Sequence, residues 1–174
     1  RFFYFCNVQT IPMSYRIGSG IDYHQLEEGC PFWLGGLQVP HHKGAVGHSD
    51  ADVLLHAICD ALLGTLGLGD IGLHFPNTDP VYKGIDSKLL LQKTIDMIHE
   101  KGYEVVNVDS TLSLQAPRIA PHIPQMQVII SSILQISTSD VSIKATTTEK
   151  LGFIGREEGV MAQATVLVKK KNPD

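Results

Sequence analysis

The stretch SDADVLLHAICDALLGTL, residues 49–66, predicts a buried α-helix. Ser49 is a favourable N-cap residue, and Asp50 and Asp52 follow it in the first turn, where negative charge is favoured. Apolar side chains cover most of the circumference of this segment. A helix that is apolar on nearly every side belongs in a protein core or in a subunit interface.

Strand-like and helix-like segments alternate on both sides of this helix. A Gly35-Gly36 pair between two short apolar runs indicates a hairpin. The strand expected over 104–114 places Val106, Val108 and Leu112 on one face. Further expected elements are strands over 16–25, 141–145 and 160–169 and helices over 88–101 and 121–136. The pattern predicts an α+β fold of the α/β type, a single domain whose mixed β-sheet is covered by helices on one face.

The composition excludes several classes of protein. The chain has 174 residues, 43% of them hydrophobic and 18% charged, which is typical of one globular domain. The formal net charge is −4, and the absence of a basic run before Lys169–Lys171 argues against a nucleic-acid partner. No apolar run approaches the roughly 18 residues that a bilayer span needs, so no membrane partner is expected.

The cysteines and the N-terminus concern the compartment. Cys6, Cys30 and Cys59 form no Cys-x-x-Cys pair, which favours a reducing environment without structural disulfides. Residues 1–14 are interpreted as an N-terminal extension, either the remnant of a truncated targeting segment or a remnant of cloning. The folded domain is expected over residues 15–171.

Three polar residues are placed as in a metal site. Asp22 and His24 lie one residue apart on the first strand, so their side chains share a face, and His56 lies in the middle of the apolar helix. Taken alone, His56 has a simpler interpretation as a core histidine bonded to Asp52 or Asp60, each four residues away. Together the three residues predict an Asp/His/His zinc site with an open fourth position, in which Asp52 or Asp60 would orient His56.

Two other segments suggest phosphate chemistry. His48 and Ser49 precede the predicted helix, whose N-terminal N–H groups favour an anion, although a plain N-cap explains the same residues. The segment KATTTEKLGFIGR, residues 144–156, offers threonine hydroxyls as donors, and its Glu149 is a carboxylate suited to a hard divalent ion. The alternative for this segment is a threonine-capped turn with a solvated Glu-Lys pair.

Five motifs occur in a fixed order along the chain. They are Gly20–His24, His48–His56, Gly69–Gly72 with Phe75–Asp79, Gln115–Arg118 continuing to Pro121–Pro124, and Lys144–Phe153. Each one alone is weak, but in this order and spacing they resemble the motifs of the 2-C-methyl-D-erythritol 2,4-cyclodiphosphate synthase family. The resemblance covers about residues 15–170.

The resemblance implies a lyase of the non-mevalonate isoprenoid pathway. Such an enzyme converts 4-diphosphocytidyl-2-C-methyl-D-erythritol 2-phosphate to 2-C-methyl-D-erythritol 2,4-cyclodiphosphate and releases CMP. The substrate's own 2-phosphate is the nucleophile, which agrees with the lack of a persuasive nucleophile–base pair in the chain. The resemblance also implies a homotrimer with active sites between subunits and a central cavity that has room for an isoprenoid diphosphate.

The resemblance assigns roles to individual residues. Asp22, His24 and His56 would hold Zn²⁺, Glu149 would hold a second divalent ion, Mg²⁺ or Mn²⁺, and His48 and Thr147 would donate to the phosphoryl oxygens. The substrate-binding residues implied by the same motifs are Ser49, Asp70, Ile71, Gly72, Phe75, Pro76, Asn77, Asp79, Leu114, Gln115, Ala116, Pro117, Ala120, Ala145, Thr146, Phe153 and Arg156.

One position departs from the family pattern, and two other functions compete. Asn77 stands where the family loop commonly has Asp; its amide keeps hydrogen-bonding capacity but carries no charge. A zinc phosphohydrolase would need a base, for which Asp50, Asp52 or Asp70 is available. A non-catalytic trimer would bind nucleotides or isoprenoid diphosphates without turnover. An extension before the family motifs suggests a plastid protein, and the alternative is a bacterial cytoplasmic enzyme.

Overall fold

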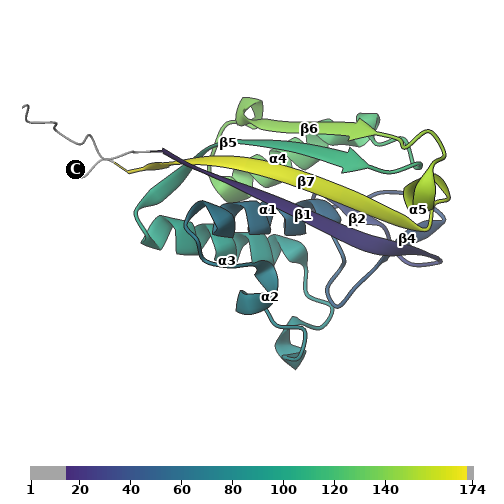
Figure 1. Ribbon diagram of the computed structural model, residues 1–174, viewed down its shortest axis with the longest axis horizontal. Coiled ribbons are helices and arrows are strands. Elements are labelled where there is room, and N and C mark those ends of the chain that lie inside the picture. Colours follow the sequence, from purple (N-terminus) through teal and green to yellow (C-terminus); the bar gives the residue numbers. More distant parts are fainter. Residues whose placement is uncertain (1–14, 172–174) are drawn as a thin grey trace, which may run out of the picture.

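The computed structural model describes residues 15–171, in which a mixed five-stranded sheet forms one layer (Figure 1). The order of the strands across the sheet is β4-β1-β7-β5-β6. β5 and β6 run parallel, and the other neighbouring pairs are antiparallel. Their bounds are β1 Tyr15–Glu28, β4 Lys43–Val46, β5 Tyr103–Ser113, β6 Val141–Thr146 and β7 Gly159–Lys170. A separate hairpin of β2 (Trp33–Leu34) and β3 (Leu37–Gln38) confirms the predicted turn at Gly35-Gly36.

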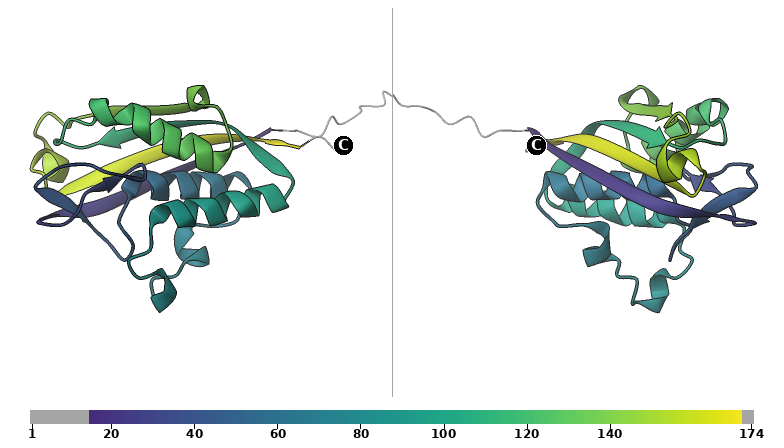
Figure 2. Two further views of the ribbon diagram at one scale, coloured as in Figure 1. Left: turned by 180° about the vertical axis from the view of Figure 1, so that it is seen from behind. Right: turned by 45° about the vertical axis from the view of Figure 1, so that its right-hand side comes forward.

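The second layer consists of helices that cover one face of the sheet, as the view from behind in Figure 2 shows, whereas one short helix, Gly152–Gly155, lies at the end of the sheet beside β7. The helices are α1 (Val53–Thr65), α2 (Ile71–His74), α3 (Ser87–Glu100), α4 (Ile123–Leu134) and α5 (Gly152–Gly155), with short 3₁₀ turns η1 (Pro80–Tyr82), η2 (Ala120–His122) and η3 (Thr138–Asp140). The core lies between the layers, where Ile58 of α1, Leu91 of α3 and Leu112 of β5 are fully buried. The predicted α+β domain with helices on one face of a mixed sheet is confirmed.

The start of α1 differs from the prediction. The helix begins at Val53, and its N-cap is Asp52 rather than Ser49. The fully buried Asp52 carboxylate accepts hydrogen bonds from the backbone N–H groups of Leu55, Gly35 and Gly36, at 3.1, 2.9 and 2.6 Å. The Asp52 carboxylate thus accepts from an N–H group of the first helical turn and also ties the start of α1 to the β2–β3 hairpin. The anion at this helix terminus is therefore a side chain of the protein itself.

Two strands also depart from the prediction. A shift of register between Val105 and Asn107 interrupts the alternation of β5, so Val105 is buried instead of the predicted Val106. The strand β4 was not predicted, because its four residues include a glycine and follow polar histidines. It pairs only with residues 25–28 of β1, and therefore leaves the rest of that edge of β1 without a strand neighbour among the described residues.

The predicted extension over residues 1–14 lies outside the described residues. The plastid hypothesis depends on this extension and therefore stays a prediction. Between residues 15 and 171, no helix combines the length and the apolar character needed to cross a membrane.

Candidate metal centre and adjoining cavities

The alternation of β1 places two ligand side chains on the helix-facing side of the sheet. Asp22 and His24 are half-buried, whereas Ile21 and Tyr23 point to the open face and are 49% and 52% exposed. This confirms that the Asp-x-His pair shares a face, as the period of two along a strand requires. It also shows that Ile21 and Tyr23 lie on the exposed side of this strand, whereas Leu26 is buried on the other side.

Two glycines of β1 bring the helix α1 close to the strand. A Cβ at Gly20 would collide with the backbone carbonyl of Ala57, and one at Gly18 would collide with that of Ala61. Because these positions have no side chain, the helix backbone packs directly on the strand. The close packing brings His56, next to Ala57 on the helix, within reach of the two ligand residues of β1.

Three acceptor atoms converge at this point. The Nε2 atom of His24 lies 3.0 Å from Asp22 Oδ2, and His56 Nδ1 lies 3.1 Å from both of these atoms. His24 Nδ1 donates to the carbonyl of Val46 at 3.0 Å, so in the neutral ring Nε2 carries a lone pair. Ser87 Oγ donates to Asp50 and can therefore accept from His56 Nε2, at 2.9 Å, which leaves a lone pair on His56 Nδ1. One carboxylate and two ring lone pairs that face one another require a cation between them.

The donor set fits zinc. Zinc bound tetrahedrally at about 2.0–2.1 Å has ligand atoms about 3.3 Å apart, close to the separations observed here. Asp, His and His on one side of an open cavity are typical of a zinc site that leaves a coordination position for substrate. Asp22, His24 and His56 form a three-ligand cluster, to which each side chain contributes one atom.

The residues that orient His56 were predicted wrongly. Asp52 caps α1, and Asp60 accepts the backbone N–H of Ile71 at 2.7 Å, so both of these carboxylates have other partners. Ser87 and Asp50 hold the outer nitrogen of His56 instead. The sequence signal for Ser87 was only that of a residue at the start of a helix, because its contact with α1 arises from tertiary packing.

The charges at the centre stabilise one another. Burial opposes ionisation of Asp22, yet contacts with His24 and His56 hold its pKa well below its usual range, because in the absence of a metal a proton between the three atoms takes the place of the cation. Burial also opposes protonation of His24, yet the Asp22 carboxylate raises the pKa of that ring. The centre therefore has a preformed negative potential that attracts a cation.

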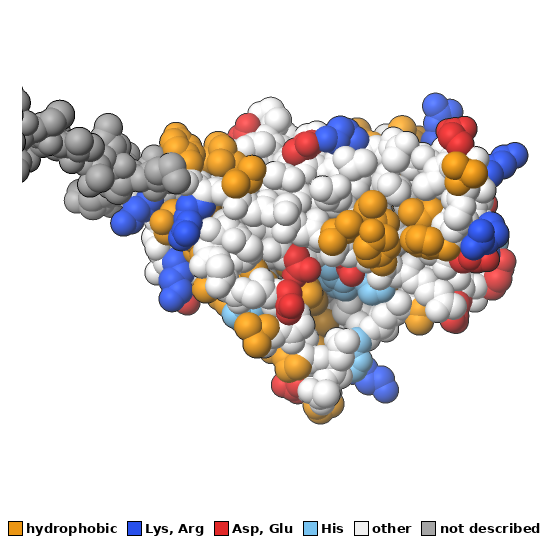
Figure 3. Space-filling view, viewed as in Figure 1, with side chains coloured by type: hydrophobic (Ala, Val, Ile, Leu, Met, Phe, Trp, Pro, Cys, Tyr) orange, Lys and Arg blue, Asp and Glu red, His pale blue; other side chains and the backbone are white. Residues whose placement is uncertain are grey.

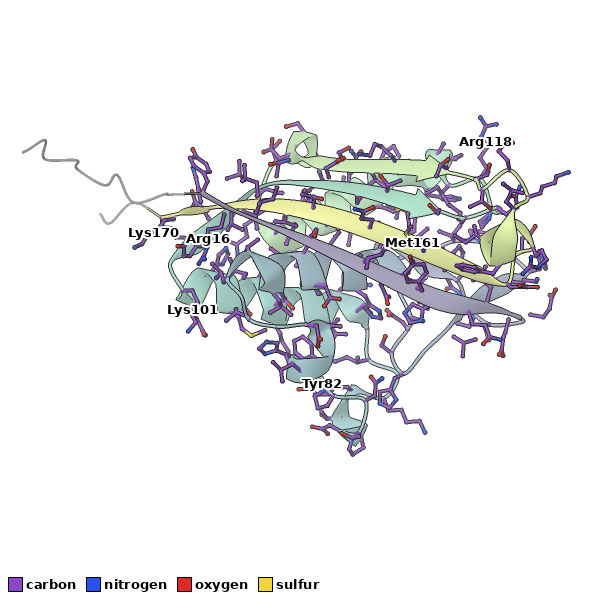
Figure 4. All side chains as sticks on the ribbon, in the orientation of Figure 1. Arg16, Tyr82, Lys101, Arg118, Met161 and Lys170 are labelled. Carbon is purple, nitrogen blue, oxygen red and sulfur yellow. The ribbon has the colours of Figure 1, made fainter. Side chains whose placement is uncertain are left out.

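A cavity of about 190 Å³ opens beside the three ligands. In Figure 3, histidines lie in the hollow between the sheet and the segment that carries α2 and η1. Of the predicted residues, the lining includes Asp22, His24, His48, Ser49, His56, Ile71, Gly72, Phe75 and Asn77. Tyr82, labelled in Figure 4 at the tip of this segment, also lines the cavity with Ile85 and Leu90, and none of the three was predicted.

Three predicted residues of this segment do not line the cavity. Asp70 caps α2 by accepting from Leu73, and Asp79 caps η1 by accepting from Val81. Pro76 is also absent from the lining. The two carboxylates shape the loop that forms the cavity wall, which accounts for their place in the motifs.

A second cavity, of about 350 Å³, lies where the parallel strands β5 and β6 end. Its lining contains the predicted Leu114, Gln115, Pro117, Ala120, Ala145, Thr146 and Thr147, but not Ala116. Arg118 and Ile119, which belong to the same predicted loop but were not among the predicted site residues, also line it; Figure 4 shows Arg118 near this end of the sheet. The adjacent carboxyl ends of two parallel strands explain why segments 30 residues apart meet here.

The remaining predicted residues lie on the following loop. Glu149 is exposed and accepts from Thr147 Oγ1 at 2.8 Å. Phe153 packs near Tyr23, with ring centroids 6.2 Å apart, and Arg156 forms a two-bond pair with Glu158. Within the described residues, Glu149 does not join the three-ligand cluster.

Comparisons with known proteins agree with this geometry. The model of the YgbB family matches residues 15–169. A 2-C-methyl-D-erythritol 2,4-cyclodiphosphate synthase of Porphyromonas gingivalis is 56% identical over 154 residues, 88% of this chain and 95% of the relative. A solved 2C-methyl-D-erythritol-2,4-cyclodiphosphate synthase in a CDP-bound form superimposes with a TM-score of 0.82 at 37% identity, covering 88% of this chain and all of that one. The bifunctional IspDF of Campylobacter jejuni gives a TM-score of 0.87 at 40% identity; 91% of this chain matches 43% of that longer protein.

Proposed function

Because the chain belongs to the YgbB family, we propose that it closes the cyclic diphosphate that its curated relatives are named for making. In this lyase reaction of the non-mevalonate isoprenoid pathway, the 2-phosphate of 4-diphosphocytidyl-2-C-methyl-D-erythritol 2-phosphate attacks the β-phosphorus. A new P–O bond forms, the bond between the β-phosphorus and the bridging oxygen breaks, and CMP leaves with the electron pair of that bond. The products are 2-C-methyl-D-erythritol 2,4-cyclodiphosphate and CMP.

The convergence of Asp22, His24 and His56 at the wall of an open cavity carries this proposal. These residues would hold zinc, which when bound supplies positive charge beside a phosphate oxygen. Joining two phosphate groups is opposed by their mutual repulsion, so a site for this reaction needs cationic charge and donors. A cavity with a preference for a cation meets the first of these needs.

His48 is well placed to act as a donor in the same cavity. Its Nε2 atom is buried and has no hydrogen-bond partner among the described residues, although the side chain lines the cavity. An unpaired polar atom at a cavity wall is available to a ligand oxygen. We assign His48 to a phosphoryl oxygen that gains charge as the new bond forms, where such a donor is most effective.

The second cavity would hold the cytidine part of the substrate. Its lining comes from the end of β6 and the loops after β5 and β6 and is largely apolar, with Leu114, Pro117 and Ile119 among the lining residues, which suits a flat base. Thr147, at its rim, would donate to the phosphate of the leaving CMP. A nucleotide fixed in one cavity and a methylerythritol phosphate fixed in the other would bring the 2-phosphate to the β-phosphorus without any nucleophile from the protein.

The second cation and the trimer belong to the same proposal. Glu149, exposed beside Thr147, would hold Mg²⁺ or Mn²⁺ against the diphosphate.

The open face of β1 carries Ile17, Ile21 and Tyr23, which are 68%, 49% and 52% exposed. A row of large apolar side chains on an uncovered sheet supports burial against other copies of the chain. In that homotrimer, cavities from adjacent subunits would complete one site, and the axis would have room for an isoprenoid diphosphate near Arg156.

A ³¹P NMR assay tests the reaction directly. The purified chain is incubated with the diphosphocytidyl substrate, Mg²⁺ and Zn²⁺, beside His56→Ala and a control variant, His99→Ala, that alters a histidine outside both cavities. We expect CMP and a cyclic diphosphate from wild type and control, and loss of both in His56→Ala. Light scattering of the same samples is expected to give three chains per particle.

The other outcomes separate the competing functions. Linear phosphate products would identify a phosphohydrolase. Binding of the substrate without turnover, in protein shown to contain zinc, would identify a binding protein and refute the catalytic proposal. Turnover that persists in His56→Ala would refute the assignment of the metal centre while leaving the reaction in place.

A further inference from the structure

A second group of metal-ligating side chains lies apart from the centre described above. It consists of His41 and His42, just before β4, and Glu157, in the turn between α5 and β7. These two segments are held together, because the side-chain Nζ of Lys43 donates to the carbonyl of Glu157 at 2.9 Å, and Leu26 of β1, which pairs with Ala45 of β4, donates its N–H to the carbonyl of Glu158 at 3.0 Å. The group shares no residue with the Asp22–His24–His56 centre or with the five motifs.

The buried nitrogen of His41 is the reason to expect a ligand here. The side chain is 9% exposed, and its Nε2 atom is buried without a hydrogen-bond partner among residues 15–171. A carboxylate oxygen of Glu157 lies 3.8 Å from this nitrogen, which is too long for a hydrogen bond. An unpaired buried nitrogen costs free energy, so its orientation toward a carboxylate implies a missing partner between them.

His42 supplies the third ligand. Its ring lies edge-on to that of His41, with centroids 4.3 Å apart, and one ligand atom from each of the three residues lies within 4.8 Å of the others. Glu28 Oε1, 3.7 Å from His42 Nε2, is a further carboxylate at the same place. We propose that His41, His42 and Glu157 form a second metal site of this chain, which takes a divalent transition-metal ion.

The ligand types select the class of ion. Two imidazoles and a carboxylate suit Zn²⁺, Co²⁺, Ni²⁺ or Cu²⁺, whereas Mg²⁺ and Ca²⁺ prefer an all-oxygen set. A ring must be neutral to bind such an ion. Burial, with a smaller contribution from His42, lowers the pKa of His41, which favours the neutral form of this ring.

Zinc counting on the full chain tests this site. The protein is stripped with a chelator, titrated with ZnCl₂ against a chromophoric competitor, and its bound zinc per chain is measured. We expect His41→Ala and Glu157→Gln each to lose one ion per chain relative to wild type, and His56→Ala with His41→Ala to lose two. His99→Ala, a histidine on α3 far from the group in sequence, controls for the loss of any histidine and is expected to lose none.

Cobalt provides a readout that does not depend on counting. Replacement of zinc by Co²⁺ in His56→Ala is expected to leave visible d–d absorption from the His41 site, and adding His41→Ala should abolish it. Zinc content unchanged by both His41→Ala and Glu157→Gln would overturn the proposal, whatever the result of the ³¹P assay. Thermal unfolding of metal-free samples shows whether each variant is folded.

Discussion

The close packing of α1 on β1 makes Gly20→Ala a decisive substitution. A methyl group at this position would lie 2.6 Å from Ala61 N and 2.8 Å from Asp60 Cβ, whereas ordinary contacts begin at 3.4 Å. The obstructing atoms belong mainly to the helix backbone, so relief requires the helix to move. The contact with Ala61 N alone requires a retreat of about 0.8 Å, and the closer contact with the carbonyl of Ala57 requires more. Even the smaller movement is several times the roughly 0.2 Å tolerance of a metal–ligand distance.

We therefore expect two measurable effects of Gly20→Ala. Overpacking at a strand–helix contact costs about 1–3 kcal/mol of unfolding free energy. Displacement of His56 is expected to weaken zinc binding by at least the 10–100-fold typical of disturbed ligand orientation. Urea unfolding of metal-free protein measures the first effect, and zinc titration against a competing chelator measures the second.

Gly64→Ala is the matched control, on the helix side of the same contact. There a methyl group would meet nothing closer than 3.7 Å, from the carbonyl of Ser19. Replacing a helix-interior glycine by alanine without a clash is expected to stabilise the protein by about 0.5–1 kcal/mol and to leave zinc affinity unchanged. If Gly20→Ala binds zinc as tightly as wild type and unfolds at the same urea concentration, direct packing on Gly20 does not position His56.

Ser87→Ala removes the closer of the two hydroxyl partners of His56 Nε2 and leaves Ser49 Oγ at 3.1 Å. It is expected to weaken zinc binding by up to about 10-fold with little change in the metal-free unfolding curve; a large loss of stability with normal affinity would show a purely structural role. Asp52→Ala removes the carboxylate that accepts from three buried N–H groups, and it is expected to lower the free energy of unfolding by about 3 kcal/mol or more. The exposed N-cap variant Asp86→Ala is expected to lower it by about 1 kcal/mol. Equal thermal shifts for the two variants would contradict this account. Burial raises the pKa of Cys59 to about 12, so the thiolate is scarce at pH 9 and iodoacetamide should modify Cys59 only after unfolding, whereas the half-buried Cys30 serves as the reactive comparison in peptide mapping. Labelling of Cys59 in folded protein at the rate of Cys30 would disprove its burial.

The fold was largely predictable because its signals are local. Periods of two and 3.6 residues, a Gly-Gly turn and acidic residues before two helices placed most elements within a few residues of their observed bounds. The errors arose where tertiary contacts decide. Asp52 outcompetes Ser49 as the cap of α1 because it also binds the distant Gly35 and Gly36, and the bulge in β5 has no local signature.

The metal ligands could be predicted because the Asp-x-His spacing on a strand and a histidine on an apolar helix, each weak alone, agree with each other and with the family motifs. The surroundings of these ligands were less accessible from sequence. Ser87 and Asp50 lie 37 positions apart, and their contact with His56 depends on how α3 packs on α1. Tyr82 reaches the cavity from a 3₁₀ turn, and no periodicity marks such a residue.

The two unlike faces of β1 also guard against misfolding. A slip of one residue in its pairing with β7 would turn Ile21 toward α1 and Asp22 toward the open face. The space opposite α1 admits only a glycine at position 20, so a slipped strand that brings a larger residue there cannot dock the helix at all. The packing of α1 therefore selects the register that points Asp22 and His24 toward His56, so the covered sheet and the metal ligands depend on the same glycine.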